Sequence, residues 1–162
     1  MPPEPTVQVR DGPVGVLVSR GGRSRRGMKF KCEKVEQLTL TLENRPGILA
    51  DLCAHLGDRH INIRAITAVD STDSGNVRLV VDDPDRARKA LSEAGVACTS
   101  ASCLALEMPN DPGGFAGIAR RLSVAGINID YIYASGLPDT VKALGIFGVS
   151  ALERALALDW EG

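Results

Sequence analysis

One unit of the sequence occurs twice, and this duplication limits the possible folds more than any other feature. Shifting the chain by 66 positions lays Asn44, Pro46, Gly47, Ala50 and Leu56 onto Asn110, Pro112, Gly113, Ala116 and Leu122. The match continues without a gap, since Ile61-Asn62-Ile63 falls on Ile127-Asn128-Ile129. Agreement at one fixed period indicates that the chain contains a single supersecondary unit twice.

Each copy begins with a strand that leads into a helix. Leu38, Leu40 and Leu42 alternate with polar residues, which is the period of a strand with one buried face. The turn that follows, residues 44–47, places a proline at a helix start. Apolar residues then recur at helical spacing at Leu49, Leu52, Cys53 and Leu56, and in the second copy at Phe115, Ile118, Ala119 and Leu122.

The remaining pattern predicts two further strands, a second helix and a fourth strand. In the first copy these are strands at 61–69 and 77–82, a helix at 84–94 and a strand at 96–100. In the second copy they are strands at 127–134 and 141–147 and a helix at 152–156, with no fourth strand. The order βαββαβ is typical of an α+β, ferredoxin-like unit, in which two helices cover one face of an antiparallel sheet. We therefore predict two tandem ferredoxin-like units, the second lacking its last strand.

The first unit is placed at residues 28–102 and the second at 103–162. Residues 1–27 combine early prolines with a glycine- and arginine-rich run and show no periodicity that would bury a face. They are predicted to be a disordered leader, and the break in composition makes Met28 an alternative translation start to Met1.

The absent fourth strand is expected to leave an edge open at Cys103 to Met108. Exposed edges recruit other strands, so the edge would pair with the first unit, with the leader or with a second chain. We favour a second chain, which predicts a homodimer through sheet edges.

Charge and motif content exclude several classes of function. A formal net charge of -1 argues against broad attraction to nucleic acid or to an anionic membrane. No apolar run reaches the ~20 residues that span a bilayer, and no secretory h-region occurs, so we expect a cytoplasmic protein. No acid-base pair, nucleophile motif, dinucleotide fingerprint or metal-ligand spacing is found. The chain is predicted to have no enzymatic activity, no cofactor and no metal site.

Two motifs in this sequence resemble the ACT domain family. The first copy reads Asn44-Arg45-Pro46-Gly47-Ile48-Leu49 after a strand, then Ile61-Asn62-Ile63; the second reads Asn110-Asp111-Pro112-Gly113-Gly114-Phe115, then Gly126-Ile127-Asn128-Ile129. The resemblance covers about residues 37–158, and small proteins with two ACT units look similar over this whole span. It implies amino-acid binding and allosteric control, usually at an interface between two ACT units whose sheets join side by side.

The Pro-Gly turns are where we expect the amino acid to bind. Unpaired N–H groups at a helix start favour a carboxylate, and Gly47 and Gly113 let the main chain approach a ligand closely. Asn44 and Asn110 either cap the helices or contact the ammonium group, capping being the simpler interpretation.

Polar residues at the second strands complete the candidate set. Asn62 and Asn128 begin these strands and either face a ligand or interface or end the preceding turn. Tyr131 and Tyr133 point to one face of their strand, where they line a pocket or, as we favour, lie at a sheet interface. The candidate ligand-binding residues are Asn44, Arg45, Pro46, Gly47, Ile48, Leu49, Asn62, Asn110, Asp111, Pro112, Gly113, Gly114, Phe115 and Asn128.

Together these features predict a non-catalytic regulatory protein. In the favoured interpretation an amino acid binds and changes the geometry presented to a partner or the oligomeric state. In the alternative, the chain is a regulatory subunit that docks on an amino-acid biosynthetic enzyme, such as acetolactate synthase, without a ligand of its own.

Overall fold

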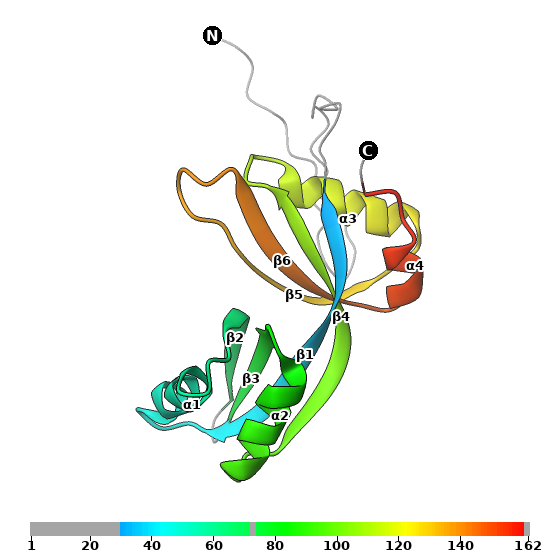
Figure 1. Cartoon of the computed structure of the whole chain (residues 1–162). Coiled ribbons are helices and arrows are strands. Elements are labelled where there is room, and N and C mark those ends of the chain that lie inside the picture. Colours follow the sequence, from blue (N-terminus) through cyan, green and yellow to red (C-terminus); the bar gives the residue numbers. More distant parts are fainter. Residues whose placement is uncertain (1–29, 72–73, 161–162) are drawn as a thin grey trace.

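The computed structural model describes residues 30–71 and 74–160, which form one six-stranded antiparallel sheet and four helices (Figure 1). The elements are β1 (Lys31–Glu43), α1 (Ile48–Gly57), β2 (Ile63–Ser71), β3 (Ser74–Val81), α2 (Pro84–Glu93), β4 (Cys98–Pro109), α3 (Gly114–Val124), β5 (Ile129–Ser135), β6 (Lys142–Val149) and α4 (Leu152–Leu156). The predicted α+β class with two ferredoxin-like units is confirmed. The predicted leader, residues 1–27, lies outside the described residues.

The two units share a continuous sheet with the strand order β2-β3-β1-β4-β6-β5. Its middle is the antiparallel pair of β1 and β4, whose register runs from Lys31 opposite Glu107 to Leu40 opposite Cys98. β4 joins the expected last strand of the first unit to the expected first strand of the second. The boundary proposed at residues 102 and 103 therefore lies inside one strand.

The edge at Cys103 to Met108 is covered by the first unit, one of the three expected partners, and not by the second chain that we favoured. Residues 103–107 pair with residues 31–35 of β1 on one side, and residues 104–109 pair with β6 on the other. The first half of β1 thus occupies the place of the fourth strand in the second unit. The reason is that β1 begins well before the leucine alternation at 38–42, so it is long enough to serve both sheets.

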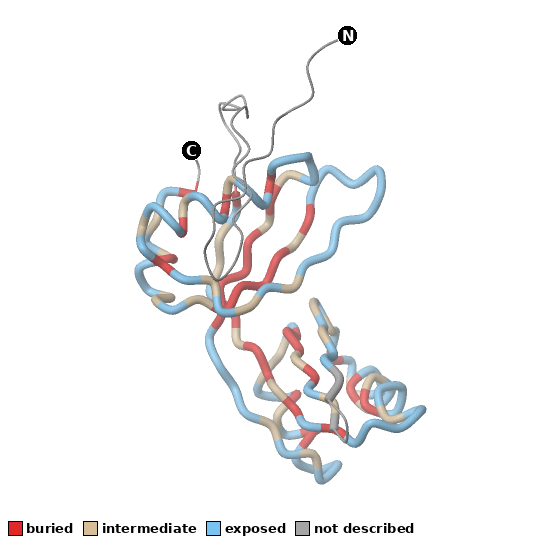
Figure 2. The backbone as a smooth tube through the Cα atoms, turned by 180° about the vertical axis from the view of Figure 1, so that it is seen from behind, coloured by how far each residue is buried: buried red, intermediate tan, exposed pale blue. Residues whose placement is uncertain are grey.

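The buried residues that alternate along the central strands belong to two cores, one beneath α1 and α2 and the other beneath α3 and α4. Leu38, Leu40 and Leu42 of β1 pack with α1 and α2, whereas Cys32 of the same strand packs against the core beneath α3 and α4. Since side chains on one face of a strand recur every two residues, both helix pairs cover the same face of the continuous sheet. Figure 2 shows the buried positions following the central strands of both units.

A third cluster lies on the helix-free face. It consists of Val35, Val80, Cys103, Ala105 and Ile146, with Ala65, Tyr131, Tyr133 and Leu144 packed against it. Because this cluster joins strands of both units, the sheet must curve so that their helix-free faces meet, and the outer strands β2 and β5 contact each other. The prediction that the two tyrosines share one face at a sheet interface is confirmed. No helix in the described ranges has the length and apolar content to cross a bilayer.

Candidate functional site

Each Pro-Gly turn ends in a glycine that starts a helix with left-handed backbone. Gly47 has a φ of 92° and Gly113 a φ of 95°, and each is the N-cap residue of its helix. Glycine has no side chain, so neither N-cap residue makes a side-chain hydrogen bond to its helix. The N-cap position that the simpler interpretation gave to Asn44 and Asn110 is occupied by Gly47 and Gly113.

Open space surrounds both glycines. A Cβ atom built on either one would meet no atom within 4 Å, so only the positive φ requires glycine there. The first-turn N–H groups that follow, in Leu49 and Phe115 among others, have no partner within the helix. Each turn therefore presents main-chain donors beside free space, and the side chains of Leu49 and Phe115 are 36% and 47% exposed.

The two turns are fixed in different ways. In the first, Arg45 Nε donates a hydrogen bond of 3.1 Å to the carboxylate of Glu43. In the second, Asn110 Nδ2 donates to the carbonyl oxygens of Leu137 and Thr140, at 2.8 and 3.1 Å. Asn110 thus ties its turn to the loop between β5 and β6, and this loop gave no local signal of the contact.

The second turn also depends on its paired glycine. A Cβ atom at Gly114 would lie 2.8 Å from the carbonyl oxygen of Pro109, so the chain can pass there only with glycine. Ile48 stands at the equivalent place in the first copy. The two turns therefore share a left-handed glycine, but only the second passes so close to a backbone carbonyl that it needs a second glycine.

The turns lie at opposite ends of the molecule. β1 and β4 are antiparallel, so Asn44 follows one end of this pair and Asn110 the other (Figure 1). The 13 residues of β1 alone span about 40 Å at ~3.3 Å per residue. One small ligand therefore cannot touch both turns of a single chain.

Asn62 and Asn128 lie far from the turns, at the ends of β2 and β5 where the two units meet. The N–H of Asn62 donates to the carboxylate of Asp82, whose own N–H donates back to the Asn62 carbonyl, both at 3.0 Å. Asn128 exchanges the same pair of bonds with Ser150, also at 3.0 Å. Both asparagines thus use their backbone to close the outer hairpin of each unit, and both are exposed.

Asn128 also lines a shallow depression of about 450 Å³ beside the end of α3. Its walls come from Ala119, Ser123, Gly126, Ile127, Asn128 and Ile129. The depression is open to solvent, and it contains one of the candidate residues and none of those at the turns.

A polar cluster lies inside the helix-free interface, and only its two tyrosines were predicted from the sequence. Gln37 Nε2 donates to the hydroxyl of Tyr131, and the hydroxyl of Tyr133 donates to Gln37 Oε1, both at 3.0 Å. Cys103 Sγ lies 3.1 Å from the Tyr131 hydroxyl, and the guanidinium of Arg78 lies 4.0 Å from the centre of the Tyr131 ring. The two-residue period of a strand places Gln37 on the same face as Val35. This spacing was the feature of the sequence from which burial of Gln37 could have been predicted.

Burial gives this cluster unusual acid-base properties. Desolvation, followed by the hydrogen bond with Cys103, raises the pKa of Tyr131 from 10.0 to about 12. Desolvation likewise raises the pKa of Tyr133 and of the Cys103 thiol. All three groups are therefore neutral at physiological pH, as a structural contact between two sheets requires.

Comparison with known proteins assigns the chain to a family. The family model for the ACT domain pair matches residues 33–157. A solved structure, protein BT0572 from Bacteroides thetaiotaomicron, is 29% identical with a TM-score of 0.71, over 76% of this chain and 85% of that chain. A comparison with curated protein sequences finds no match.

More distant structures share the fold. The ligand-free regulatory subunit of aspartate kinase from Thermus thermophilus is 19% identical with a TM-score of 0.59, over 83% of this chain and 95% of that one. The aspartokinase alpha and beta subunits give 17% identity and a TM-score of 0.59, over 79% and 92%. The family match covers both repeats and agrees with their turns, sheets and helices, and the chain belongs to the family of ACT domain pairs.

Proposed function

We propose that this chain is a non-catalytic, cytoplasmic regulatory protein that binds a free amino acid at its Pro-Gly turns. The observation that carries the proposal is the pair of helices that begin at left-handed glycines, with open space at each glycine. Retention of this arrangement in both copies, although their neighbouring residues differ, supports a role in binding. The shared fold with a regulatory subunit of aspartate kinase agrees with this proposal.

The chemistry of the turns suits an amino acid. Its carboxylate would accept hydrogen bonds from first-turn N–H groups, where the helix dipole also favours negative charge. Its side chain would lie on the exposed apolar residue of the same turn, Leu49 or Phe115. Asn44 and Asp111 would supply oxygen atoms for the ammonium group.

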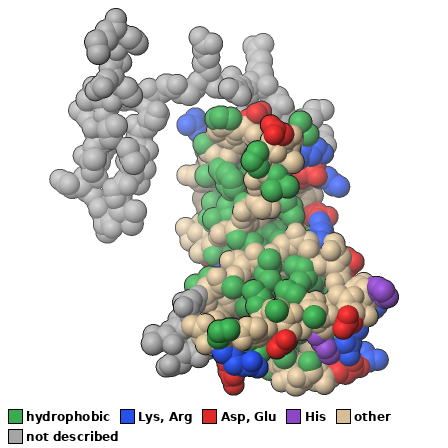
Figure 3. Space-filling model, turned by 90° about the vertical axis from the view of Figure 1, so that its left-hand side faces the viewer, with side chains coloured by type: hydrophobic (Ala, Val, Ile, Leu, Met, Phe, Trp, Pro, Cys, Tyr) green, Lys and Arg blue, Asp and Glu red, His purple; other side chains and the backbone are tan. Residues whose placement is uncertain are grey.

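A second copy of the chain would complete each site. β2 and β5 are the outer strands, and their outward edges have no partner strand in the described residues. Apolar side chains gather over both units on the face that Figure 3 shows. The large apolar residues exposed on these strands and beside the turns are Leu49, Ile66, Val69, Phe115, Ile132, Leu137 and Val141. We propose a homodimer through these edges, since exposed edges and apolar patches favour association.

The same apolar surface supports the alternative of docking on a metabolic enzyme. Light scattering of the purified chain separates the two: a dimer supports edge pairing, whereas a monomer of 17.2 kDa, with and without amino acids, contradicts it. A monomer that shows no response to any amino acid would favour the docking subunit.

Thermal melting with each of the twenty amino acids tests binding, because a ligand of the folded state raises stability by RT ln(1 + [L]/Kd). Gly47→Val and Gly113→Val place a branched side chain at the turns and should remove the ligand response. Both variants also strain a positive φ. Gly95→Val is the matched control, because Gly95 has a φ of 72°, open space around it and a position outside both turns.

The control should lose stability and keep the full ligand response. A response that survives the combined Gly47→Val and Gly113→Val changes would refute the assignment of the ligand to the turns.

A further inference from the structure

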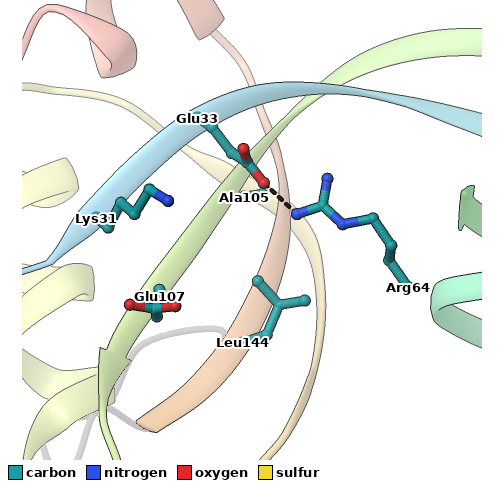
Figure 4. A pocket seen from close by; sticks show the side chains of 6 residues that line it. All are labelled: Lys31, Glu33, Arg64, Ala105, Glu107 and Leu144. Carbon is teal, nitrogen blue, oxygen red and sulfur yellow. Dashed lines mark hydrogen bonds and ion pairs between the residues drawn. The ribbon is translucent and has the colours of Figure 1, made fainter. Parts of the chain in front are cut away.

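A small charged notch lies on the helix-free face, where β2 of the first unit leans over the sheet of the second. It is lined by Lys31 and Glu33 of β1, Arg64 of β2, Ala105 and Glu107 of β4, and Leu144 of β6 (Figure 4). Its volume is about 90 Å³. Five of the six residues belong to the sheet beneath α3 and α4, and Arg64 alone reaches in from the other unit.

The lining carries two cations and two anions on an apolar floor. Arg64 forms an ion pair with Glu33 across the opening, and Lys31 points into the opening from the opposite side (Figure 4). Glu107 pairs with Lys142, which stands outside the notch. Its hydrogen bond with Lys142, and more weakly the charge of Lys31, hold the pKa of Glu107 below its usual range.

Lys31 is the lining charge that forms no ion pair, although its charge acts on Glu107 opposite it on β4. Within the described residues it has no carboxylate within ion-pair distance. Ala105 and Leu144 form the apolar part of the wall. The notch thus combines one unpaired ammonium group, a guanidinium group and two carboxylates with a short apolar surface.

We propose that this notch binds a small zwitterionic amino acid, separately from the Pro-Gly turns. The ligand carboxylate lies between Lys31 and Arg64, its ammonium group faces Glu107, and its short side chain contacts Ala105 and Leu144. A lining with equal numbers of positive and negative groups is matched by a zwitterion, whereas an anion or a cation would leave like charges facing it. The inference rests on the proposed function only for the ligand class.

Volume limits which amino acids fit. A space of 90 Å³ equals about three water molecules at ~30 Å³ each, enough for glycine, alanine or serine and too little to enclose an aromatic residue. Because Arg64 comes from the first unit and the other lining groups from the second, the ligand would join the two units at their interface. Binding at the notch should therefore resist separation of the helix-free faces.

Titration of the full chain with glycine, followed by amide chemical shifts in NMR, tests the proposal. We expect shifts at Ala105, Glu107 and Leu144, and affinity reduced at least about tenfold in Lys31→Gln and in Glu107→Gln, as for loss of a charged hydrogen bond. Lys34→Gln is the matched control. Lys34 lies on the same strand, pairs with Glu153 and does not line the notch, so its replacement should leave affinity unchanged.

Two further experiments distinguish recognition of the ligand's charges from the fit of its shape. Leu144→Phe changes no charge and should block binding by filling the notch. Acetate and methylammonium, each with one charge of the zwitterion, should bind at least about tenfold more weakly than glycine. Equal binding of acetate and glycine would overturn the zwitterion and show a simple anion site.

The outcome is independent of the Pro-Gly turns. Glycine binding that persists in the combined Gly47→Val and Gly113→Val variant and disappears in Lys31→Gln supports the notch, even if the proposed function fails. Binding lost in the glycine variants and kept in Lys31→Gln overturns the notch and leaves the proposed function standing. Absence of any glycine-induced shift in the wild-type chain also overturns the notch.

Discussion

Gln37 on β1 donates a hydrogen bond of 3.0 Å to the hydroxyl of Tyr131 on β5, which joins two strands that are not neighbours in the sheet. Among the described residues, Gln37 is the one polar side chain that is fully buried, at 2% exposure. A buried amide is tolerated only when its hydrogen bonds are made, so the contact holds the two helix-free faces in register.

Replacing Gln37 by leucine should therefore destabilise the fold. Gln37→Leu leaves two partly buried tyrosine hydroxyls without this partner, and we expect a loss of about 1–3 kcal/mol in the free energy of unfolding, measured with urea. Combined with Tyr131→Phe, a double-mutant cycle should give a coupling of about 0.5–1.5 kcal/mol. Strictly additive single changes would show that the hydrogen bond contributes nothing.

The tyrosines also predict how stability depends on pH. Above pH 10 an unfolded tyrosine ionises, whereas folded Tyr131 keeps its proton up to a pKa of about 12. Its contribution is complete below pH 10 and is lost as the pH rises through that window, so the free energy of unfolding should fall there. The chain has only two tyrosines, and the combined Tyr131→Phe and Tyr133→Phe variant should show a shallower fall. An identical slope in both proteins would contradict this origin.

The repeat explains why much of the fold could be predicted. Alternation at Leu38 to Leu42 identified the face that packs on α1 and α2, and the turn and helix residues repeated 66 positions later identified the second unit. Residues 31–36 gave no such signal, because Cys32 faces the second core, Val35 faces the third cluster and charged residues lie between them. The pairing of β1 with the edge at residues 103–107 joins segments far apart in the sequence, and the periodicity of one segment cannot specify such a partner.

The candidate site was predictable in its backbone and less so in its side chains. The Pro-Gly motif located both helix starts, since a glycine with positive φ is a local property. The partner of Asn110 lies 27 positions away in a loop, and the distance between the two turns follows only from the register of β1 and β4. The charged notch depends on Arg64 meeting Glu33 across two units, which no local pattern contains.

Trp160 closes the core beneath α3 and α4, and its truncation should be costly. It is 5% exposed, packs edge-to-face on Phe30 at 6.1 Å, and donates from Nε1 to the Ala155 carbonyl at 2.9 Å. We expect Trp160→Ala to lower the free energy of unfolding by about 3–5 kcal/mol, measured by calorimetry. Trp160→Phe keeps an aromatic ring and should lose clearly less. Equal losses would mean that the hydrogen bond, and not packing, is what matters.

A final prediction comes from comparing the two copies at the ends of α1 and α3. His60 and Gly126 are equivalent positions, both in left-handed conformation, with φ values of 55° and 66°. In each copy the N–H of this residue donates to the carbonyl three positions earlier, Gly57 or Ser123, at 2.8 and 3.0 Å.

The backbone is thus the same in both copies, but only the second has the residue that suits it. For a residue with a Cβ atom, the left-handed conformation costs roughly 1–2 kcal/mol. Gly126→His should therefore destabilise the protein by about that amount, while His60→Gly should stabilise it by up to about 1 kcal/mol, less the entropy that glycine loses on folding. Urea unfolding measures both. His60→Ala is the control, because it removes the imidazole and keeps the strain; if alanine stabilised the fold as much as glycine, the imidazole and not the backbone would be the source of the cost.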